Sequence, residues 1–316
     1  MSAPAGLRDF IESCELPHAA FLEHEHALLR RLKDAVAGRP PVSEWIVGPS
    51  RVGKSMLIAR LLRQFPEERV NGVRHIPVLK VDIPSPATPK ELPRSLLSAL
   101  GHADAKGSSN ALLTRVERLL KLTGTKAVLF EEASHIVDIG NKMPPRAAGD
   151  WFKGLMENLG LTIILFGIPR LEKLYASNEQ LRKRSQARRV FRPYDYTDTA
   201  ERRAFAACVR TYVEMFKNQG YTFDIPFETL VQHCYLLCGG LVGVVSTFMN
   251  RIAYDIEPCG RRSISFEDCR ASATLMEVSG SPAHPAFARE AVSPVELNQA
   301  YAYVMKEAEL PLRRAV

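Results

Sequence analysis

Apolar and polar positions along the chain follow two different patterns, which divide the sequence into two parts. In the first part, short apolar runs alternate with segments whose apolar residues recur every three or four positions. The runs predict buried strands and the longer segments predict amphipathic helices. The predicted strands are residues 45–47, 75–81, 127–130 and 161–166, and the predicted helices are residues 19–37, 56–62, 89–100, 110–122 and one that begins at Asp150. This alternation predicts a parallel sheet flanked by helices.

The second part of the chain shows helical periodicity only. The predicted helices there are residues 199–218, 227–238, 241–254 and 266–273. Residues 277–294 are rich in Pro, Ser and Ala, which is typical of a linker or tail. We therefore expect an N-terminal helical segment (residues 1–40), an α/β core (41–198), a small helical lid (199–275) and a linker with a C-terminal tail (276–316). Asn110 is the expected N-cap of the helix at 110–122.

The first predicted strand leads into Gly48-Pro49-Ser50-Arg51-Val52-Gly53-Lys54-Ser55, and a predicted helix follows. This is a complete phosphate-binding loop (P-loop) in its required strand–loop–helix context. Its backbone N–H groups predict a cradle for the phosphates of ATP, in which Lys54 reaches the β- and γ-phosphates and Ser55 ligates Mg²⁺. A glycine turn without a ligand is the improbable alternative. An α/β core with this loop, followed by a helical lid, is the outline of an AAA+ ATPase.

Two acidic residues, Glu131 and Glu132, follow the third predicted strand. In P-loop ATPases an acid at this position supports Mg²⁺, and the next carboxylate polarises the attacking water. We therefore predict that Glu131 supports the metal and that Glu132 is the catalytic base. Glu131 stands where aspartate is usual, and its extra methylene moves the carboxylate by about 1.5 Å. A pair of solvated acids is the alternative interpretation.

Six basic residues and no acidic residue lie between Leu181 and Pro193. They are Arg182, Lys183, Arg184, Arg188, Arg189 and Arg192. AAA+ rings and filaments carry, between the fourth strand and the lid, an arginine that enters the neighbouring subunit's site. Such an arginine finger stabilises charge on the γ-phosphate in trans, and therefore requires oligomerisation. Arg184 is the first candidate and Arg188 the second, with a solvated basic surface as the alternative for each.

Composition adds three expectations. The net charge of +7 and the pI near 9.1 favour an anionic partner, with nucleic acid as the first candidate. No apolar run approaches the ~20 residues of a membrane span, and the N-terminus lacks a signal-peptide pattern, so we expect a cytoplasmic protein without a membrane partner. Among the six cysteines, Cys234 and Cys238 lie four apart on an apolar helix, where buried thiols are expected more than a metal site.

Beyond the P-loop, the sequence carries Asp150-Trp151-Phe152-Lys153 and, further on, Asn178-Glu179-Gln180. With these stretches the chain resembles the TnsC/TniB family, the AAA+ regulators of heteromeric and CRISPR-associated transposons. The resemblance covers about residues 20–275. Its other matching stretches are residues 45–62, Lys90-Glu91-Leu92, residues 130–138, 154–159, 167–169 and 181–184, and the lid segment at residues 239–243.

The resemblance implies a protein that assembles with ATP as a helical filament or ring on double-stranded DNA, without reading its sequence. Such a protein would connect a target-selection protein of the TniQ type to the transposase and would not cut DNA itself. By the same similarity, Lys90, Lys106 and Ser108 would follow the DNA backbone, as an ammonium or hydroxyl group in contact with phosphate can do. Lys142 and Arg146 are looser candidates, for which a solvated loop is preferred.

Three features depart from the usual AAA+ pattern. The fourth strand ends in Phe166-Gly167-Ile168, without a polar residue to orient water, and the lid reads Gly243-Val244-Val245 where many AAA+ proteins carry an arginine. Together with Glu131 in place of aspartate, they predict slow hydrolysis of ATP to ADP and phosphate. ATP would then act mainly as an assembly ligand.

Two other interpretations stay open. A replication initiator or helicase loader also forms ATP-dependent spirals on DNA, although many initiators have a winged-helix pattern after the lid and none is evident here. The other is a non-catalytic scaffold that binds nucleotide and uses its basic residues for protein partners. A small-molecule kinase is the least favoured, because the lid and the basic segment offer no evident acceptor site.

Overall fold

The computed structural model describes residues 6–16, 18–138 and 143–312, and these form two compact units. The α/β unit comprises Phe21–Gly48 and Lys54–Phe191. The helical unit comprises the chain up to Ala20, the short segment Pro49–Gly53, and the chain from Arg192 onward. The predicted N-terminal segment (residues 1–40) is thus divided equally between the two units, after Ala20. The basic charge is concentrated in the α/β unit. This unit holds 27 Lys and Arg against 17 Asp and Glu and so has a net charge of +10, whereas the whole chain has a net charge of +7.

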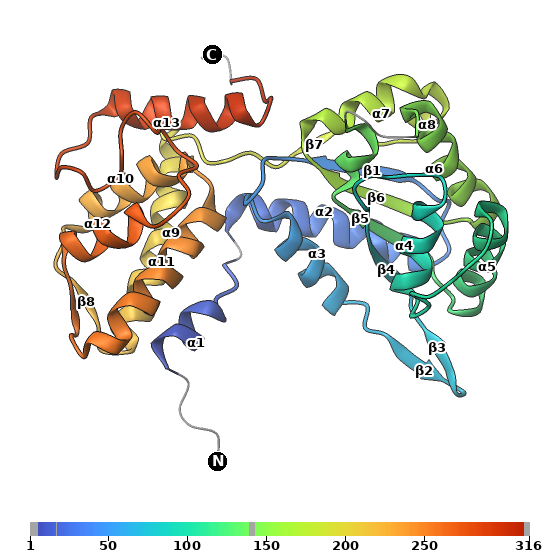
Figure 1. Cartoon of the computed structure of the whole chain (residues 1–316), viewed down its shortest axis with the longest axis horizontal. Helices are drawn as coiled ribbons and strands as arrows, with labels where there is room; N and C mark the ends of the chain where they lie inside the picture. The colour runs from blue at the N-terminus through green and yellow to red at the C-terminus, as the bar shows by residue number, and fades with distance from the viewer. Residues whose placement is uncertain (1–5, 17, 139–142, 313–316) are drawn as a thin grey trace. The chain divides into compact units, whose positions relative to one another are not determined.

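The α/β unit is built on a five-stranded parallel sheet in the order β4-β5-β6-β1-β7 (Figure 1). Its strands are β1 (Ser43–Val47), β4 (Val78–Asp82), β5 (Ala127–Glu131), β6 (Thr162–Gly167) and β7 (Arg189–Val190). Every residue of β1, β5 and β6 is buried, as expected for central strands of a parallel sheet. Because the strands are parallel, the residues that follow β1 and those that end β4 and β5 meet at one edge. The predicted parallel sheet is confirmed, and β7 is an additional strand within the basic segment.

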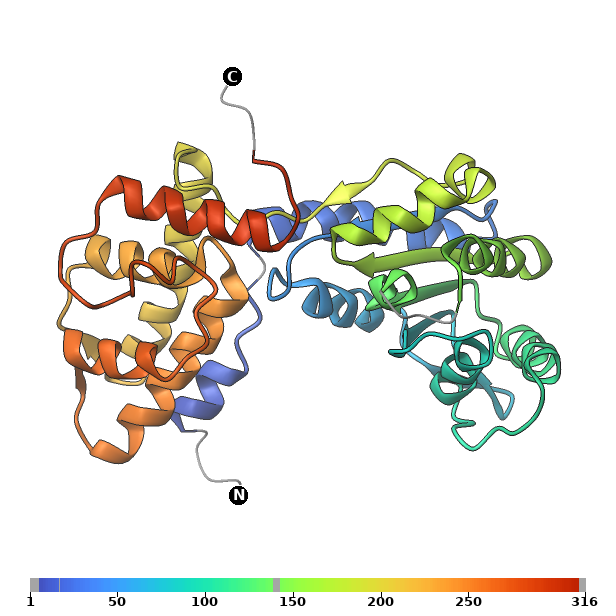
Figure 2. The same ribbon diagram turned by 45° about the horizontal axis from the view of Figure 1, so that its top comes forward.

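Helices cover both faces of this sheet (Figures 1 and 2). One face, which includes Val81, Phe130 and Leu165, packs against apolar residues of α4 (Glu91–Ala99), α5 (Ser109–Leu122) and α6 (Pro145–Leu159). The remaining elements of the unit are α2 (Ala19–Val36), α3 (Lys54–Arg63), α7 (Glu172–Ser177), α8 (Glu179–Lys183), the 3-10 turns η1 (Ala133–Val137) and η2 (Pro169–Leu171), and the hairpin of β2 (Glu68–Val70) with β3 (Val73–His75). Ser108, not Asn110, caps α5, because its hydroxyl accepts the N–H of Ala111 at 3.3 Å.

The helical unit contains α1 (Leu7–Glu12), α9 (Thr199–Asn218), α10 (Phe227–Cys238), α11 (Val242–Ile256), α12 (Phe266–Thr274) and α13 (Pro294–Glu307). The turn η3 (Glu257–Cys259) and the short parallel pair β8 (Thr222–Phe223) and β9 (Ser263–Ile264) complete it. The predicted helices at 199–218 and 227–238 are confirmed at both ends. Cys234 and Cys238 are buried, and burial raises the pKa of both thiols, that of Cys238 to about 12.

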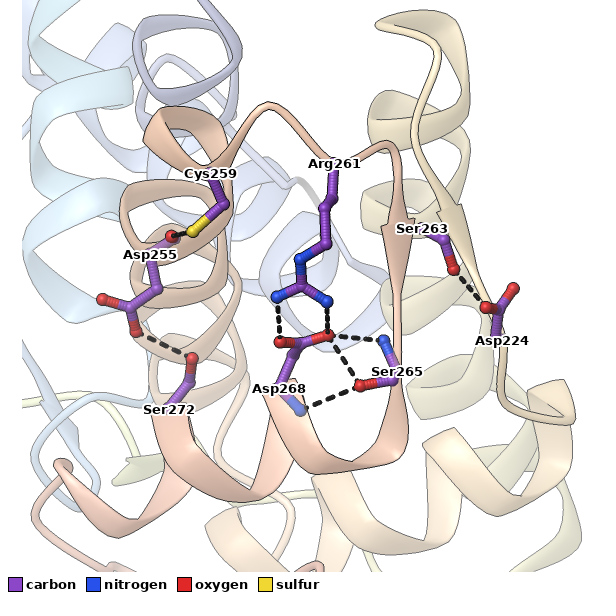
Figure 3. Close-up of polar contacts among 8 residues, drawn as sticks. All are labelled: Asp224, Asp255, Cys259, Arg261, Ser263, Ser265, Asp268 and Ser272. Atoms are coloured by element: carbon purple, nitrogen blue, oxygen red, sulfur yellow. Dashed lines mark hydrogen bonds and ion pairs between the residues drawn. The ribbon is translucent and has the colours of Figure 1, made fainter.

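Polar contacts fix the connection from α11 to α12 (Figure 3). Arg261 forms a two-pronged ion pair with Asp268, whose carboxylate also accepts the N–H of Ser265 in a capping box at the start of α12. The hydroxyl of Ser272 donates to Asp255 at 2.8 Å and thereby joins α12 to α11. Polar side chains therefore hold α12 and the segment before it to each other and to α11.

The segment predicted as a linker and tail packs on the helical unit instead. The ring of Phe287 is fully buried and stacks on His233 and Phe248. Helix α13 packs against α10 through Leu297, Ala300, Tyr301, Val304 and Met305, which recur every three or four positions. The helical periodicity of residues 294–307 follows a Pro-, Ser- and Ala-rich stretch, which is why residues 276–316 were expected to be a linker and a C-terminal tail.

No single described helix is long and apolar enough to cross a bilayer. Helix α10 and the segment Val242–Cys259 meet the length and composition criterion together, as a pair that is bent by 115°.

Candidate nucleotide site

The P-loop connects β1 to α3 at the carboxyl edge of the sheet. Its base is anchored by Gly48, whose N–H donates to the carbonyl of Gly167 in the neighbouring strand β6 at 3.1 Å. Two loop residues have left-handed backbone conformations: Gly53, with φ of 110°, and Arg51, with φ of 62°. A positive φ is unusual for a non-glycine residue and is characteristic of functional loops. The loop tip, Pro49–Gly53, groups with the helical unit, where the N–H of Gly243 donates to the carbonyl of Arg51 at 3.0 Å.

Lys54 begins α3, and its side chain folds back over the loop. Its Nζ donates to the carbonyl of Gly48 at 2.8 Å, and the residue is 8% exposed. Burial lowers the pKa of Lys54 to about 8, although the negative charges of Glu132 and Glu131 oppose the shift. The ammonium group is therefore mostly protonated at neutral pH and is hydrogen-bonded to the first residue of the P-loop.

Ser55 and Glu131, the two predicted metal residues, are in direct contact. The hydroxyl of Ser55 donates to Oε1 of Glu131. The other oxygen, Oε2, lies 2.8 Å from Nζ of Lys80, which also lies 3.1 Å from Oδ1 of Asp82. Burial would raise the pKa of Glu131, but the hydrogen bonds from Lys80 and Ser55 outweigh it and lower the pKa. A hydroxyl beside a carboxylate is a donor set that suits Mg²⁺, which prefers oxygen ligands.

Lys80 is the residue of this site that sequence reasoning missed. It lies within the predicted strand 75–81, between the buried residues Leu79 and Val81. A single lysine in an apolar strand was the available signal. Its partners on β4 and β5 became evident only from the strand pairing, in which Asp82 lies opposite Glu131.

Glu132, the predicted base, follows Glu131 at the end of β5. Its backbone is left-handed, with φ of 52°, and its side chain is exposed. The negative charge of Glu132 is the largest influence that raises the pKa of Lys54. The predicted base therefore lies close to the P-loop lysine and is open to water.

The two family-specific stretches form one clamp between α6 and α8. Asn178 donates its side-chain amide to Asp150 at 2.9 Å, and its carbonyl oxygen accepts the N–H of Leu181 at 2.9 Å. Lys153 on α6 hydrogen-bonds Gln180 on α8. Gly149 leaves room for this contact, since a Cβ there would lie 2.7 Å from the amide nitrogen of Asn178. The clamp fixes α8, whose last residues, Arg182 and Lys183, begin the basic segment.

The basic segment is more internally paired than its sequence suggests. Arg188 pairs with Glu172 at 2.7 Å, Arg189 with the buried Glu44 at 3.3 Å, and Arg192 donates to the carbonyl of Pro311 at 2.8 Å. Arg184, the first candidate for the arginine finger, pairs with Glu157 on α6 and is 44% exposed. Lys183 pairs with Glu179, whereas no ion pair or side-chain hydrogen bond joins Arg182 to another described residue. Among the arginines of the basic segment, Arg182 and Arg184 are thus the two that are exposed to solvent.

The family is decided by a comparison that covers more than half of the chain. A family model described as "Bacterial TniB protein" matches residues 18–194. This chain belongs to the TniB family. The matched segment contains the P-loop, the Ser55–Glu131 contact, the clamp and the basic segment. A comparison with curated protein sequences gives no match.

Several solved structures have a fold similar to that of this TniB-family chain. Cdc6p from Pyrobaculum aerophilum matches with a TM-score of 0.63 and 11% identity, over 97% of this chain and 86% of that one. The ORC1 protein of Aeropyrum pernix, solved in complex with DNA, gives 0.58 and 17%, over 84% and 68%. The ORC2 protein of the same organism, in ADPNP-ADP complexes, gives 0.58 and 13%, over 84% and 71%. The fold is that of the AAA+ ATPases, as predicted.

Two of the positions that depart from the AAA+ pattern, Gly167 and Gly243, are closely packed against neighbouring atoms. At the end of β6, a Cβ on Gly167 would overlap the hydroxyl of Ser134, which accepts the N–H of Ile168 at 2.7 Å. In the helical unit, a Cβ on Gly243 would clash with the carbonyl oxygen of Arg51. Neither glycine therefore has room for a side chain in this TniB-family chain.

The residues predicted to contact DNA lie on α4 and on the loop before α5. Lys90 is the exposed N-cap residue of α4, and Lys106 is exposed on the loop. Lys106 lines an open groove of about 390 Å³ together with Arg94, one turn beyond Lys90 on α4. Ser108 is exposed and caps α5. Arg146 is exposed near the start of α6, and Lys142 lies outside the described residues.

Proposed function

We propose that this chain is an ATP-dependent, DNA-binding AAA+ regulator of transposition. It oligomerises on double-stranded DNA as a filament or ring and connects a target-selection protein of the TniQ type to the transposase. The observation that carries the proposal is a complete P-loop whose Ser55 contacts Glu131, in a chain of the TniB family. Cutting DNA is not part of the proposed role.

In the nucleotide site, Gly48 through Ser55 surround the phosphates, and Lys54 exchanges the carbonyl of Gly48 for phosphate oxygens. Ser55 and Glu131 would hold Mg²⁺, which neutralises charge on the β- and γ-phosphates when bound. Glu132, close to Lys54 and open to water, accepts the proton of the attacking water as ATP becomes ADP and phosphate. Arg184 of one subunit leaves Glu157 and stabilises the γ-phosphate in the site of the next.

Hydrolysis in this account is slow, so that ATP serves mainly to hold subunits together. The end of β6 and the start of α11 carry Gly167 and Gly243, and neither supplies a group that orients water or senses the γ-phosphate. An assembly of this kind persists while ATP is intact and loosens after hydrolysis.

The proposed DNA contact is electrostatic. Lys90, Lys106 and Ser108 would follow the phosphate backbone, and the excess of +10 in the α/β unit supports attraction to DNA. The ORC1 protein with the same fold was solved in complex with DNA. Backbone contacts of this type do not discriminate between sequences.

The proposal is tested by fluorescence anisotropy of labelled duplexes. We expect binding that requires ATP or a non-hydrolysable analogue, is equal for two unrelated sequences, and weakens steeply with salt. Binding that ignores nucleotide, or the absence of DNA binding, would contradict it and favour a nucleotide-binding scaffold.

The likeness to Cdc6p over most of the chain favours one second candidate, a replication initiator or helicase loader. Co-purification distinguishes the two. The transposition regulator retains a TniQ-type protein and a transposase in the presence of ATP and DNA, whereas an initiator retains a replicative helicase.

A further inference from the structure

Lys80 interrupts an apolar strand, and its ammonium group lies between two carboxylates at the carboxyl edge of the sheet. Leu79 and Val81 on either side are buried, whereas the side chain of Lys80 is 37% exposed. Its Nζ is 2.8 Å from Glu131 and 3.1 Å from Asp82. No catalytic role proposed above uses this lysine.

The position of Lys80 matters because Glu131 has both carboxylate oxygens engaged. One accepts the hydroxyl of Ser55, the other faces Lys80, and the side chain is only 10% exposed. A buried carboxylate beside bound phosphates would repel them unless a cation compensated its charge. In most nucleotide sites that cation is Mg²⁺.

The length of Glu131 is matched to this arrangement. An aspartate at the same position would end about 1.5 Å earlier. It would lose one of its two contacts, to Ser55 at the start of α3 or to Lys80 on β4. The glutamate at position 131 is therefore the side chain that can contact Ser55 and also form the ion pair with Lys80 on the neighbouring strand.

We propose that Lys80 is a resident counter-cation of the nucleotide site, which neutralises Glu131 and allows nucleotide to bind without Mg²⁺. The inference rests on the proposed function to the extent that phosphates occupy the P-loop. Asp82 gives Lys80 a second acceptor, so the lysine stays paired when Glu131 turns to another cation. Lys80 is a positioning residue in this account, because it acts on the phosphates through Glu131.

The test measures the dissociation constant of a fluorescent ADP analogue in excess EDTA and in millimolar Mg²⁺. For the wild-type chain we expect the two constants to agree within about threefold. For Lys80→Met we expect the affinity in EDTA to fall at least about tenfold, with a smaller change in Mg²⁺, because the carboxylate that contacts Ser55 of the P-loop would carry an uncompensated negative charge.

Three variants separate this role from a purely structural one. Lys80→Arg keeps the charge and should behave like the wild-type chain. The double variant Lys80→Met/Glu131→Gln removes the charge that needs compensation and should regain binding in EDTA. Lys126→Met, an exposed lysine just before β5, is the matched control and should change neither constant. If Lys80→Met proves unstable, the double variant still tests whether the charge of Glu131 is what weakens nucleotide binding in EDTA.

Two results would overturn the inference. One is that the dissociation constant in EDTA divided by that in Mg²⁺ is the same for the wild-type chain and for Lys80→Met. The other is a wild-type chain that depends on Mg²⁺ as strongly as that variant does. If wild type and Lys54→Ala bind no nucleotide in either condition, the proposed function fails as well, so the two failures are distinguishable.

Discussion

The side-chain amide of Asn178 donates to the carboxylate of Asp150 at 2.9 Å and so joins α8 to α6. The same Asn178 caps α8 through the N–H of Leu181, and it is 5% exposed. Both residues come from the stretches that are most specific to the family. Their contact gives these stretches a physical role, which is to hold in place the helix that leads into the basic segment.

Replacing Asn178 tests this clamp. We expect Asn178→Ala to lower the free energy of unfolding by about 2 kcal/mol, since it leaves a buried N–H and a carboxylate without their partner. Ser177→Ala is the neighbouring control, because that hydroxyl only bonds back to Leu174 within its own helix. Chemical denaturation of the two variants measures the difference, and equal stabilities would contradict the clamp.

Gly243 should tolerate no side chain. A Cβ at this position would meet the carbonyl oxygen of Arg51 at the tip of the P-loop, and backbone does not move as readily as a side chain. We expect Gly243→Ala to weaken nucleotide binding at least about fivefold. In α6, Gly154 has open space around it, so Gly154→Ala should leave binding unchanged and slightly raise stability. Titration with fluorescent ADP compares the two.

His233 should make the helical unit less stable in mild acid. Its Nδ1 accepts the N–H of Phe287 and its Nε2 donates to the carbonyl of Glu290, so the neutral ring fits this site. Burial lowers the pKa of His233 below 6.5, and the unfolded chain therefore binds the proton more readily. This contribution to stability is complete above about pH 6.5 and is lost as the pH falls below it.

The measurement is the melting temperature between pH 5 and pH 8 for the wild-type chain and for His233→Gln. The loss toward low pH should be smaller in the variant. His24, whose pKa burial also lowers, acts in the same direction and remains in both proteins. The exposed His26 provides the control, and His26→Gln should follow the wild-type curve. Parallel curves for wild type and His233→Gln would contradict the assignment.

The arginine in trans can be tested by mixing two inactive variants. Glu132→Gln lacks the base and Arg184→Ala lacks the finger, so we expect each alone to lose at least about 100-fold in ATP hydrolysis. In an equal mixture, about a quarter of the subunit interfaces pair an intact site with an intact finger. ATP hydrolysis by the mixture should therefore return to about a quarter of the wild-type rate. No recovery would place Arg184 outside the neighbour's site. The same mixture made with Arg182→Ala tests its exposed neighbour.

Lys90 and Lys106 should act on DNA affinity without changing sequence preference. Each alanine variant is expected to reduce the slope of log affinity against log salt by about one. Lys126→Ala, which replaces an exposed lysine of the same unit just before β5, should leave the slope unchanged. Anisotropy titrations at several salt concentrations give the slopes, and a slope that neither lysine affects would remove this face from the proposed DNA contact.

Much of this architecture could be predicted because its elements are long and strongly periodic. Helices α9 and α10 begin and end at the predicted residues, and the P-loop lies between a strand and a helix as its sequence requires. Strand β7 was missed because Arg189 and Val190 carry no apolar pattern, and only pairing with β1 makes them a strand. Lys80 was missed because its role depends on Glu131, which comes from a different strand.

The measurement that tests the central claim most directly is electron microscopy of the purified chain with double-stranded DNA. It compares samples with ATP, with a non-hydrolysable analogue and without nucleotide. We expect filaments or rings that need both DNA and nucleotide and that disappear in Lys54→Ala. Monomers under every condition would contradict the assembly and with it the arginine in trans.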